Sequence, residues 1–194
     1  MSLITLCRAT PHDVDIVLAD VQAGFDSYLD FAPRGWIPPD VSRDRHLTVD
    51  LLCSPDTWAL LALVQETPVG HIAFFPARRR IQGEPPQDWR RRPVIPGAAH
   101  LWQLFVLPAW WGRGVAAMLH DAAVTEMRAR RYREGRLYTP ALHARARRFY
   151  EKRGWGAVGE EEDAPFGLGV LEYHLDLAHP APPPRTCRRR GARR

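Results

Sequence analysis

Hydrophobic positions in the first quarter of the chain recur with the periods of one short strand and two helices. Residues 3–8 predict the strand, and Thr10 followed by Pro11 is typical of a helix start. The apolar residues that follow have helical spacing: Val14, Val17, Leu18, Val21 and Phe25. Residues 24–40 are rich in aromatic residues and proline, which predicts a loop or broken helix, and residues 42–52 predict a second short helix.

The middle of the chain consists of apolar runs separated by turn residues. Residues 58–64 and 69–75 flank the pair Thr67-Pro68, which predicts a β-hairpin. Residues 78–97 form a long irregular segment, and loops of this length in compact domains are usually functional or disordered. Residues 99–107 are almost continuously apolar, which favours a central strand covered on both faces.

The last third predicts two helices and two strands. Helices are expected at residues 115–131 and 141–153, the second ending at Gly154, which is a typical helix-terminating glycine. Strands are expected near residues 136–139 and 168–177. The whole order is strand, two helices, three strands, helix, strand, helix, strand. This order predicts an α/β protein of mixed α+β type, with helices on the faces of a mixed sheet.

Composition indicates one ordinary globular domain followed by a basic tail. The 194 residues are 45% hydrophobic and 25% charged, enough to bury a core. The net charge of +5 belongs to residues 180–194, because removing their six arginines leaves 21 basic against 22 acidic residues. We therefore expect a domain over residues 1–179 and a disordered, solvated tail. Contact of the tail with nucleic acid or an acidic surface is the alternative.

Several classes of protein are disfavoured by the sequence. No apolar run approaches the ~18 residues of a membrane-spanning helix, and the N-terminal residues lack the pattern of a secretory signal. The three cysteines, Cys7, Cys53 and Cys187, are odd in number and far apart, which fits neither a disulfide framework nor a metal site. We expect a cytoplasmic protein without a membrane partner or a bound metal.

The turn Gly112-Arg113-Gly114 joins the apolar strand to the next helix without a capping side chain. Backbone N–H groups at a helix N-terminus bind anions, most naturally a phosphate, and glycine permits close approach. A tight turn without a ligand is the alternative. A P-loop is excluded because no Gly-Lys-Ser/Thr follows. A dinucleotide fingerprint fits Gly112, Gly114 and Ala117, but Glu134 precedes the next strand and too little chain follows.

Two segments, LFVLPAWWGRGVA and HARARRFYEKRGW, resemble the motifs of the GNAT superfamily of N-acetyltransferases. The positions that match are Val106, Pro108, Gly114, Ala116, Ala146, Tyr150, Gly154 and Trp155. The order of elements over residues 3–178 is similar as well. The resemblance implies a mixed, mostly antiparallel sheet of six to seven strands with helices on both faces.

The resemblance also implies an acetyl-CoA site. The backbone of Leu104, Phe105 and Val106 would pair with the pantetheine arm. The pyrophosphate would bind at the turn and the first helical residues, namely Gly112, Arg113, Gly114, Val115, Ala116 and Ala117. His143 and Ala146 would complete the cofactor site. Two residues depart from the family pattern, since Trp111 replaces Gln or Arg and His143 replaces Asn; Arg113 could supply the missing charge.

For catalysis, the resemblance places Tyr150 where a helix tyrosine protonates the departing thiolate. Counting back along the strand puts His100 where some members carry a glutamate base, and a histidine could accept an amine proton at neutral pH. A strand-end histidine without chemistry, or deprotonation through water, is the alternative. His71 and Glu172 are weaker candidates for the base.

The chemistry of the resemblance predicts the class of the acceptor. An amine is expected, carried by a small metabolite, an aminoglycoside-like antibiotic or a peptide N-terminus. Tyr28, Phe31 and Trp36 would form an apolar wall of the acceptor site, or pack over the core. The arginine triplets 78–80 and 90–92 would attract an anionic acceptor, or be solvated. An acyl-CoA-binding regulator without catalysis, and an RNA-associated acetyltransferase using the tail, are the competing functions; a homodimer is compatible with the resemblance.

Overall fold

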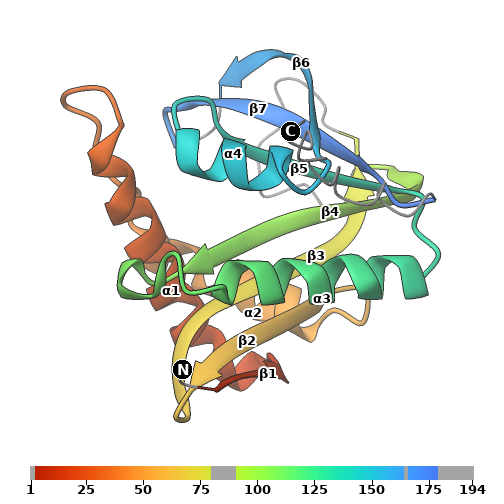
Figure 1. Ribbon diagram of the computed structural model, residues 1–194, viewed down its shortest axis with the longest axis horizontal. Coiled ribbons are helices and arrows are strands. Elements are labelled where there is room, and N and C mark those ends of the chain that lie inside the picture. Colours follow the sequence, from red (N-terminus) through yellow and green to blue (C-terminus); the bar gives the residue numbers. More distant parts are fainter. Residues whose placement is uncertain (1–2, 80–90, 164–165, 179–194) are drawn as a thin grey trace, which may run out of the picture.

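The computed structural model describes residues 3–79, 91–163 and 166–178. Within these residues the chain forms a twisted sheet covered by helices (Figure 1). The seven strands are β1 (Ile4–Arg8), β2 (Trp58–Val64), β3 (Thr67–Arg78), β4 (Val94–Val106), β5 (Glu134–Pro140), β6 (Gly156–Asp163) and β7 (Gly169–Asp176). The four α-helices are α1 (Val14–Asp26), α2 (Arg45–Cys53), α3 (Val115–Ala129) and α4 (Ala144–Glu151).

The strands form one sheet in the order β1-β2-β3-β4-β5-β7-β6. All neighbouring strands are antiparallel except β4 and β5, which are parallel. A parallel pair needs a crossover connection, and α3 supplies it. The predicted mixed, mostly antiparallel sheet is therefore confirmed.

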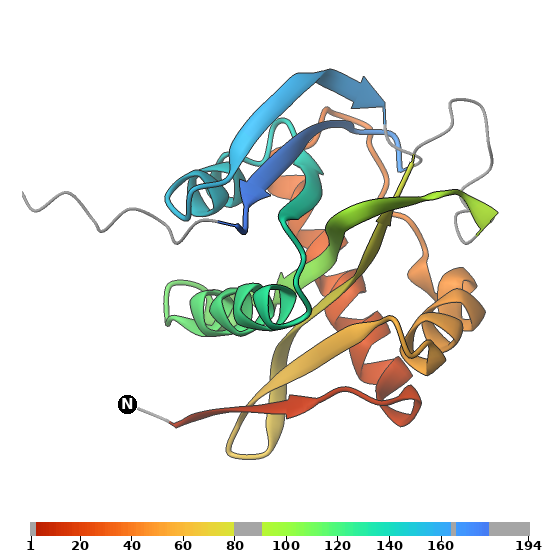
Figure 2. The same cartoon turned by 90° about the vertical axis from the view of Figure 1, so that its right-hand side faces the viewer.

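The helices cover both faces of the sheet, as predicted (Figure 2). On one face, α1 buries Val17, Leu18 and Val21 against apolar residues of β2 and β3. On the other face, α3 and α4 pack on the larger core, to which α3 contributes Leu119, Ala123 and Met127 and α4 contributes Tyr150. The apolar stripe of α1 and that of α3 each face the sheet because their members recur at helical spacing.

The parallel pair of strands is joined over only a short length. β4 and β5 pair from Ala98–Glu134 to His100–Arg136 and no further. The register of β3 against β4 also shifts, since Ala73 lies opposite Gln103 while Phe74 lies opposite Leu101. Trp102 is thus the extra residue of a β-bulge, which bends the strand. As a result, the carboxyl halves of β4 and β5 are free to diverge and open a wedge in the sheet.

The structure corrects several predicted boundaries. β6 was not expected, and it pairs with β7 at the edge of the sheet. Its acidic run and the irregular register between Val158 and Glu162 conceal the alternation of an ordinary strand. The predicted irregular segment is shorter, because β3 extends to Arg78 and β4 begins at Val94. The second helix begins with a 3₁₀ turn, Val41–Asp44.

Other expectations concern parts that the structure does not reach. The tail over residues 180–194, Cys187, Arg80 and Arg90 lie outside the described residues. The boundary between domain and tail therefore stays a prediction. In the part of the chain that is described, no helix is both long and apolar enough to cross a membrane.

Candidate active site

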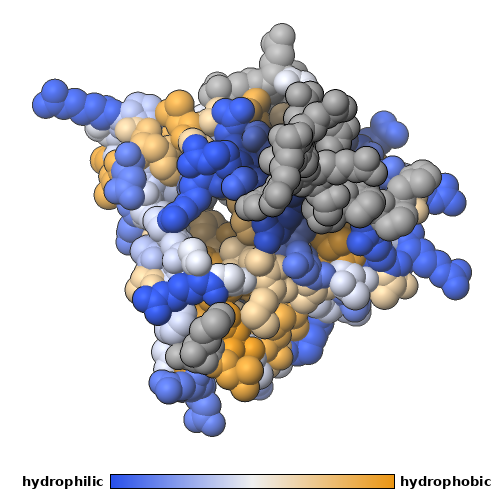
Figure 3. Space-filling model, viewed as in Figure 1, coloured by the Kyte–Doolittle hydropathy of each residue, from blue (hydrophilic) through white to orange (hydrophobic). Residues whose placement is uncertain are grey.

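A cleft of about 360 Å³ lies where β4 and β5 diverge. Its walls are β4 from Leu101 to Val106, Tyr138 and Thr139 of β5, the beginnings of α3 and α4, and the end of α1. The space-filling view shows a hollow near the middle of this side of the molecule (Figure 3). The structure brings most of the predicted cofactor residues to this one cleft: Leu104, Phe105, Val106, Gly112, Gly114, Val115, Ala116, Ala117, His143 and Ala146.

The glycine turn presents an uncapped helix N-terminus to the cleft. Gly112 and Gly114 have left-handed backbones, with φ of 75° and 88°. Gly114 is the N-cap of α3, and no side chain caps the helix. The N–H groups of the first helical turn have no partner within a helix, and Val115, Ala116 and Ala117 line the cleft. These donors and the positive end of the helix dipole form a place for an anion.

Arginines add positive charge to this cleft. Arg145 and Arg153 line it, with the Arg145 guanidinium 4.5 Å from the centre of the Trp111 ring. Arg113, the predicted source of charge, is not among the lining residues and stacks on Trp110 at 5.0 Å. Sequence reasoning missed Arg145, although its position in the first turn of α4, beside the motif residue Ala146, is a signal that could have identified it.

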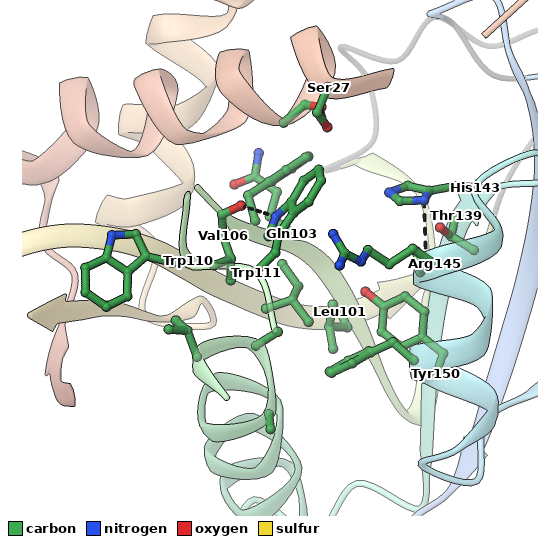
Figure 4. Close-up of a pocket in the computed structure, with 18 of the residues that line it drawn as sticks. Ser27, Leu101, Gln103, Val106, Trp110, Trp111, Thr139, His143, Arg145 and Tyr150 are labelled. Atoms are coloured by element: carbon green, nitrogen blue, oxygen red, sulfur yellow. Dashed lines mark hydrogen bonds between the residues drawn. The ribbon is translucent and has the colours of Figure 1, made fainter. Parts of the chain in front are cut away.

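Trp111 turns toward the strand that precedes the glycine turn. Its indole N–H donates a hydrogen bond of 2.7 Å to the carbonyl of Val106 (Figure 4). Trp111 lines the cleft, and its polar atom is used inside the protein. The carbonyl that it binds is one of the backbone groups expected to pair with pantetheine. Trp111 and a ligand in this part of the cleft would therefore compete for one acceptor oxygen.

Tyr150 of α4 is buried, and its hydroxyl points into the cleft (Figure 4). The ring packs edge-on against Phe149 and Trp155, with centroids at 5.3 and 5.9 Å. Burial raises the pKa of Tyr150 well above its usual value, and nearby Tyr28 raises it further. The phenol therefore keeps its proton at neutral pH and is available as a donor to a group in the cleft.

His143 acts as the N-cap of α4. Its Nδ1 accepts a hydrogen bond of 3.4 Å from the backbone N–H of Ala146 (Figure 4). Burial, and then the nearby Arg145, lower the pKa of His143 to about 4. A neutral ring is what this cap requires, because Nδ1 must carry a lone pair. His143 thus performs the capping that an asparagine side chain also provides.

The aromatic residues after α1 form one wall beside the cleft. Tyr28 is buried and lines it, and its ring lies 5.1 Å from Phe31 and 6.3 Å from Trp36. Phe31 also lies 4.7 Å from the His143 ring. The Trp36 indole donates to the carbonyl of Phe166 at 2.7 Å, which joins this loop to the segment between β6 and β7. Of the three predicted acceptor residues, Tyr28 reaches the cleft directly.

His100 lies outside this cleft. It lines a second cavity of about 390 Å³, together with Arg78, Arg136 and Glu172. Burial is the main cause that lowers the pKa of His100 to about 4, while Glu172 opposes the shift. Tyr138 lines both cavities and separates His100 from Tyr150. The two predicted catalytic residues therefore face different spaces, and His100 is a weaker base than an unperturbed histidine.

Comparison with known proteins identifies the family. The model of the acetyltransferase (GNAT) family matches residues 22–155, which is more than half of the chain. The chain belongs to this family and is an acyltransferase. Among curated proteins, no sequence matches it.

Solved structures of several acetyltransferases share the fold. A Desulfovibrio desulfuricans protein assigned to the GNAT family is 20% identical, with 90% of this chain and 99% of that one covered and a TM-score of 0.66. PaiA N-acetyltransferase from Thermoplasma acidophilum, solved in complex with coenzyme A, is 16% identical, with 88% and 98% covered and a TM-score of 0.64. Ribosomal-protein-alanine N-acetyltransferase from Brucella melitensis is 18% identical, with 89% and 99% covered and a TM-score of 0.64. Family membership and the coenzyme A complex of PaiA support acetyl-CoA as the acyl donor.

Proposed function

We propose that this protein is an N-acetyltransferase that moves the acetyl group of acetyl-CoA directly to a primary amine in a ternary complex. One observation carries the proposal. The uncapped N-terminus of α3 and the hydroxyl of Tyr150 belong to the same cleft, in a chain of the acetyltransferase family. An anion site and a proton donor in one cleft are what a phosphate-bearing thioester requires.

The residues around the cleft fit coenzyme A. The pyrophosphate would bind the N–H groups from Gly112 to Ala117, with Arg145 as a cationic neighbour. The pantetheine arm would lie along the backbone of residues 104–106, which forms one wall of the cleft. Trp111 fits less simply, because its hydrogen bond to Val106 uses one backbone acceptor of that wall. The hydrogen bond of Trp111 does not use the backbone N–H groups from Gly112 to Ala117, where the pyrophosphate would bind.

The chemistry assigned to this chain consists of binding the thioester and holding a proton for the departing sulfur. When bound, acetyl-CoA supplies the acetyl group as an activated thioester. Tyr150 holds a proton at Oη for the departing sulfur, in a buried position that keeps the phenol protonated. The amine loses a proton as its bond to carbon forms and the carbon–sulfur bond breaks. Because His100 faces the second cavity, water is the simpler proton acceptor in this proposal, with His100 and Glu172 as residues to test.

The proposed acceptor belongs to the class of primary amines. It is an amine of a small molecule or a peptide, entering beside the aromatic wall of Tyr28, Phe31 and Trp36. A cytoplasmic location remains part of the proposal, since Cys7 and Cys53 are free thiols. A homodimer stays a prediction.

Release of free coenzyme A tests the proposal. The purified protein is incubated with acetyl-CoA and a panel of amines that includes amino acids, polyamines, aminoglycosides and peptides with free N-termini. Thiol release is followed by colorimetry, and acetylated products by mass spectrometry. We expect one class of amine to raise thiol release well above hydrolysis, with loss of the signal in Tyr150→Phe. A protein that binds acetyl-CoA yet acetylates no amine would refute the enzymatic proposal and favour a regulator.

A further inference from the structure

Three buried polar side chains form a row between α1 and the wall of the cleft. Asp20 of α1, His71 of β3 and Gln103 of β4 are 5%, 1% and 9% exposed. His71 Nδ1 lies 3.1 Å from Asp20 Oδ2, and His71 Nε2 lies 3.0 Å from Gln103 Oε1. Gln103 also lines the cleft. The row therefore connects a carboxylate deep under α1 with the place where substrate would bind.

Charge balance indicates the protonation of the middle member. A buried carboxylate is costly unless it is paired with a positive charge and hydrogen-bonded. Among the described residues, His71 is the side chain that the structure pairs with Asp20. Both ring nitrogens of His71 face oxygen atoms, which is the arrangement of a ring that carries two N–H donors. An imidazolium between Asp20 and Gln103 satisfies both requirements.

The protonation of His71 decides which end of the Gln103 amide faces the cleft. If Nε2–H donates to Oε1 of Gln103, the amide NH₂ is left for the cleft. If the ring were neutral with its proton on Nδ1, Nε2 would accept from the amide NH₂, and Oε1 would face the cleft instead. Asp20 faces the opposite ring nitrogen, Nδ1, at 3.1 Å, so the orientation of the Gln103 amide is linked to Asp20 through the His71 ring.

We propose that Gln103 binds a carbonyl oxygen of the substrate through its amide NH₂, and that Asp20 and His71 are positioning residues that hold the amide in this orientation. Gln103 shares the face toward α1 with Phe105, two residues further along the strand, and the β-bulge brings Trp102 to this face as well. The inference rests on the proposed acetyl transfer and names a substrate-binding group that the family motifs do not mark. It has a consequence that is independent of activity, namely the state of the His71 ring.

The first test is spectroscopic. Histidine labelled with ¹⁵N reports how many ring nitrogens carry protons, and His71→Gln identifies the His71 signal among the eight histidines. At neutral pH we expect two protonated nitrogens in the wild type and one in Asp20→Asn. A neutral His71 in the wild type would overturn the inference, whether or not the protein acetylates an amine.

The second test is a double-mutant cycle on kcat/KM. Gln103→Met keeps the length of the side chain and removes the amide, and loss of one hydrogen bond corresponds to a decrease of about tenfold. Asp20→Asn should give a comparable decrease, and the double variant should be no worse than either single variant. Asp15→Asn is the matched control, since Asp15 is an exposed residue of the same helix that pairs with Arg45.

The outcomes separate this inference from the proposed function. If the wild type acetylates amines but Gln103→Met is as active, the inference fails while the function stands. Additive losses, or losses that follow the melting temperature alone, would show a merely structural row and also overturn it. If the wild type acetylates nothing, the proposed function fails, and the ¹⁵N experiment still decides the orientation of the row.

Discussion

Removing the hydroxyl of Tyr150 should separate turnover from folding and from binding. The ring of Tyr150 packs against Phe149, Trp155 and Tyr173, and Tyr150→Phe leaves all three contacts in place. Burial, and then Tyr28, raise the pKa of the hydroxyl, and no described side chain forms a hydrogen bond with it that the substitution would remove. We therefore expect the free energy of unfolding to change by less than about 1 kcal/mol.

The expected loss of turnover is much larger. A donor directed at a developing charge contributes about 100-fold to the rate, or about 2.7 kcal/mol. The raised pKa makes full transfer of the proton to sulfur difficult, so hydrogen bonding to the departing thiolate is the main contribution. It also means that activity should show no alkaline decline from Tyr150 at or below its usual pKa of about 10.

Steady-state kinetics and calorimetry provide the assay. Tyr150→Phe should lower kcat about 100-fold, while the dissociation constant of acetyl-CoA changes by less than about threefold. Phe149→Leu, a change in the neighbouring ring, serves as a control for altered packing in α4. Turnover in Tyr150→Phe equal to that of the wild type would refute the assignment of the proton donor.

Three further results are expected. Gly114→Ala places a Cβ on a backbone with φ of 88°, which costs about 1–2 kcal/mol. The melting temperature and the affinity for acetyl-CoA should therefore both fall. Unchanged values would show that the turn can relax to another conformation. Arg145→Gln should weaken acetyl-CoA binding several-fold at low salt and less at high salt, and a loss independent of salt would contradict an electrostatic contact. The pKa of His100 is about 4 in the folded protein and about 6.5 in an unfolded chain, so between these pH values the unfolded chain binds the proton more readily. Urea unfolding should show stability declining as the pH falls from about 6.5 toward 4, with a smaller decline in His100→Gln because His143, whose pKa is also lowered to about 4, still contributes; equal declines would show that His100 contributes nothing to this dependence.

The sequence alone was sufficient for the family and the fold class, because both depend on local signals. Strand and helix periods, the glycine turn and the motif around Tyr150 all lie within short segments of the chain. The apolar run before Pro108 and the helix after Gly114 each require only their own residues to be recognised. The edge strand β6 escaped prediction because its alternation is interrupted and half of its residues are acidic.

The arrangement of the site depends on contacts between distant residues, which a single sequence does not reveal. Counting back along β4 placed His100 beside the chemistry, but which cavity each residue of β4 faces depends on the bulge at Trp102 and on the pairing with β3. The row of Asp20, His71 and Gln103 joins residues 51 and 32 positions apart. The contact of Trp36 with Phe166 spans 130 positions. Such contacts follow from the register of the sheet, which is fixed only in the folded protein.

Calorimetric titration with acetyl-CoA, with NAD in parallel, tests the central claim most directly. The cleft between β4 and β5 should bind one acetyl-CoA per chain with micromolar affinity and should not bind NAD, because the anion site at Gly112–Ala117 is combined with a wall suited to pantetheine and not with a dinucleotide fold. Absence of acetyl-CoA binding, in a protein whose melting curve shows it to be folded, would contradict the account. The glycine turn would then be a structural turn, with Trp111 closing the cleft against Val106.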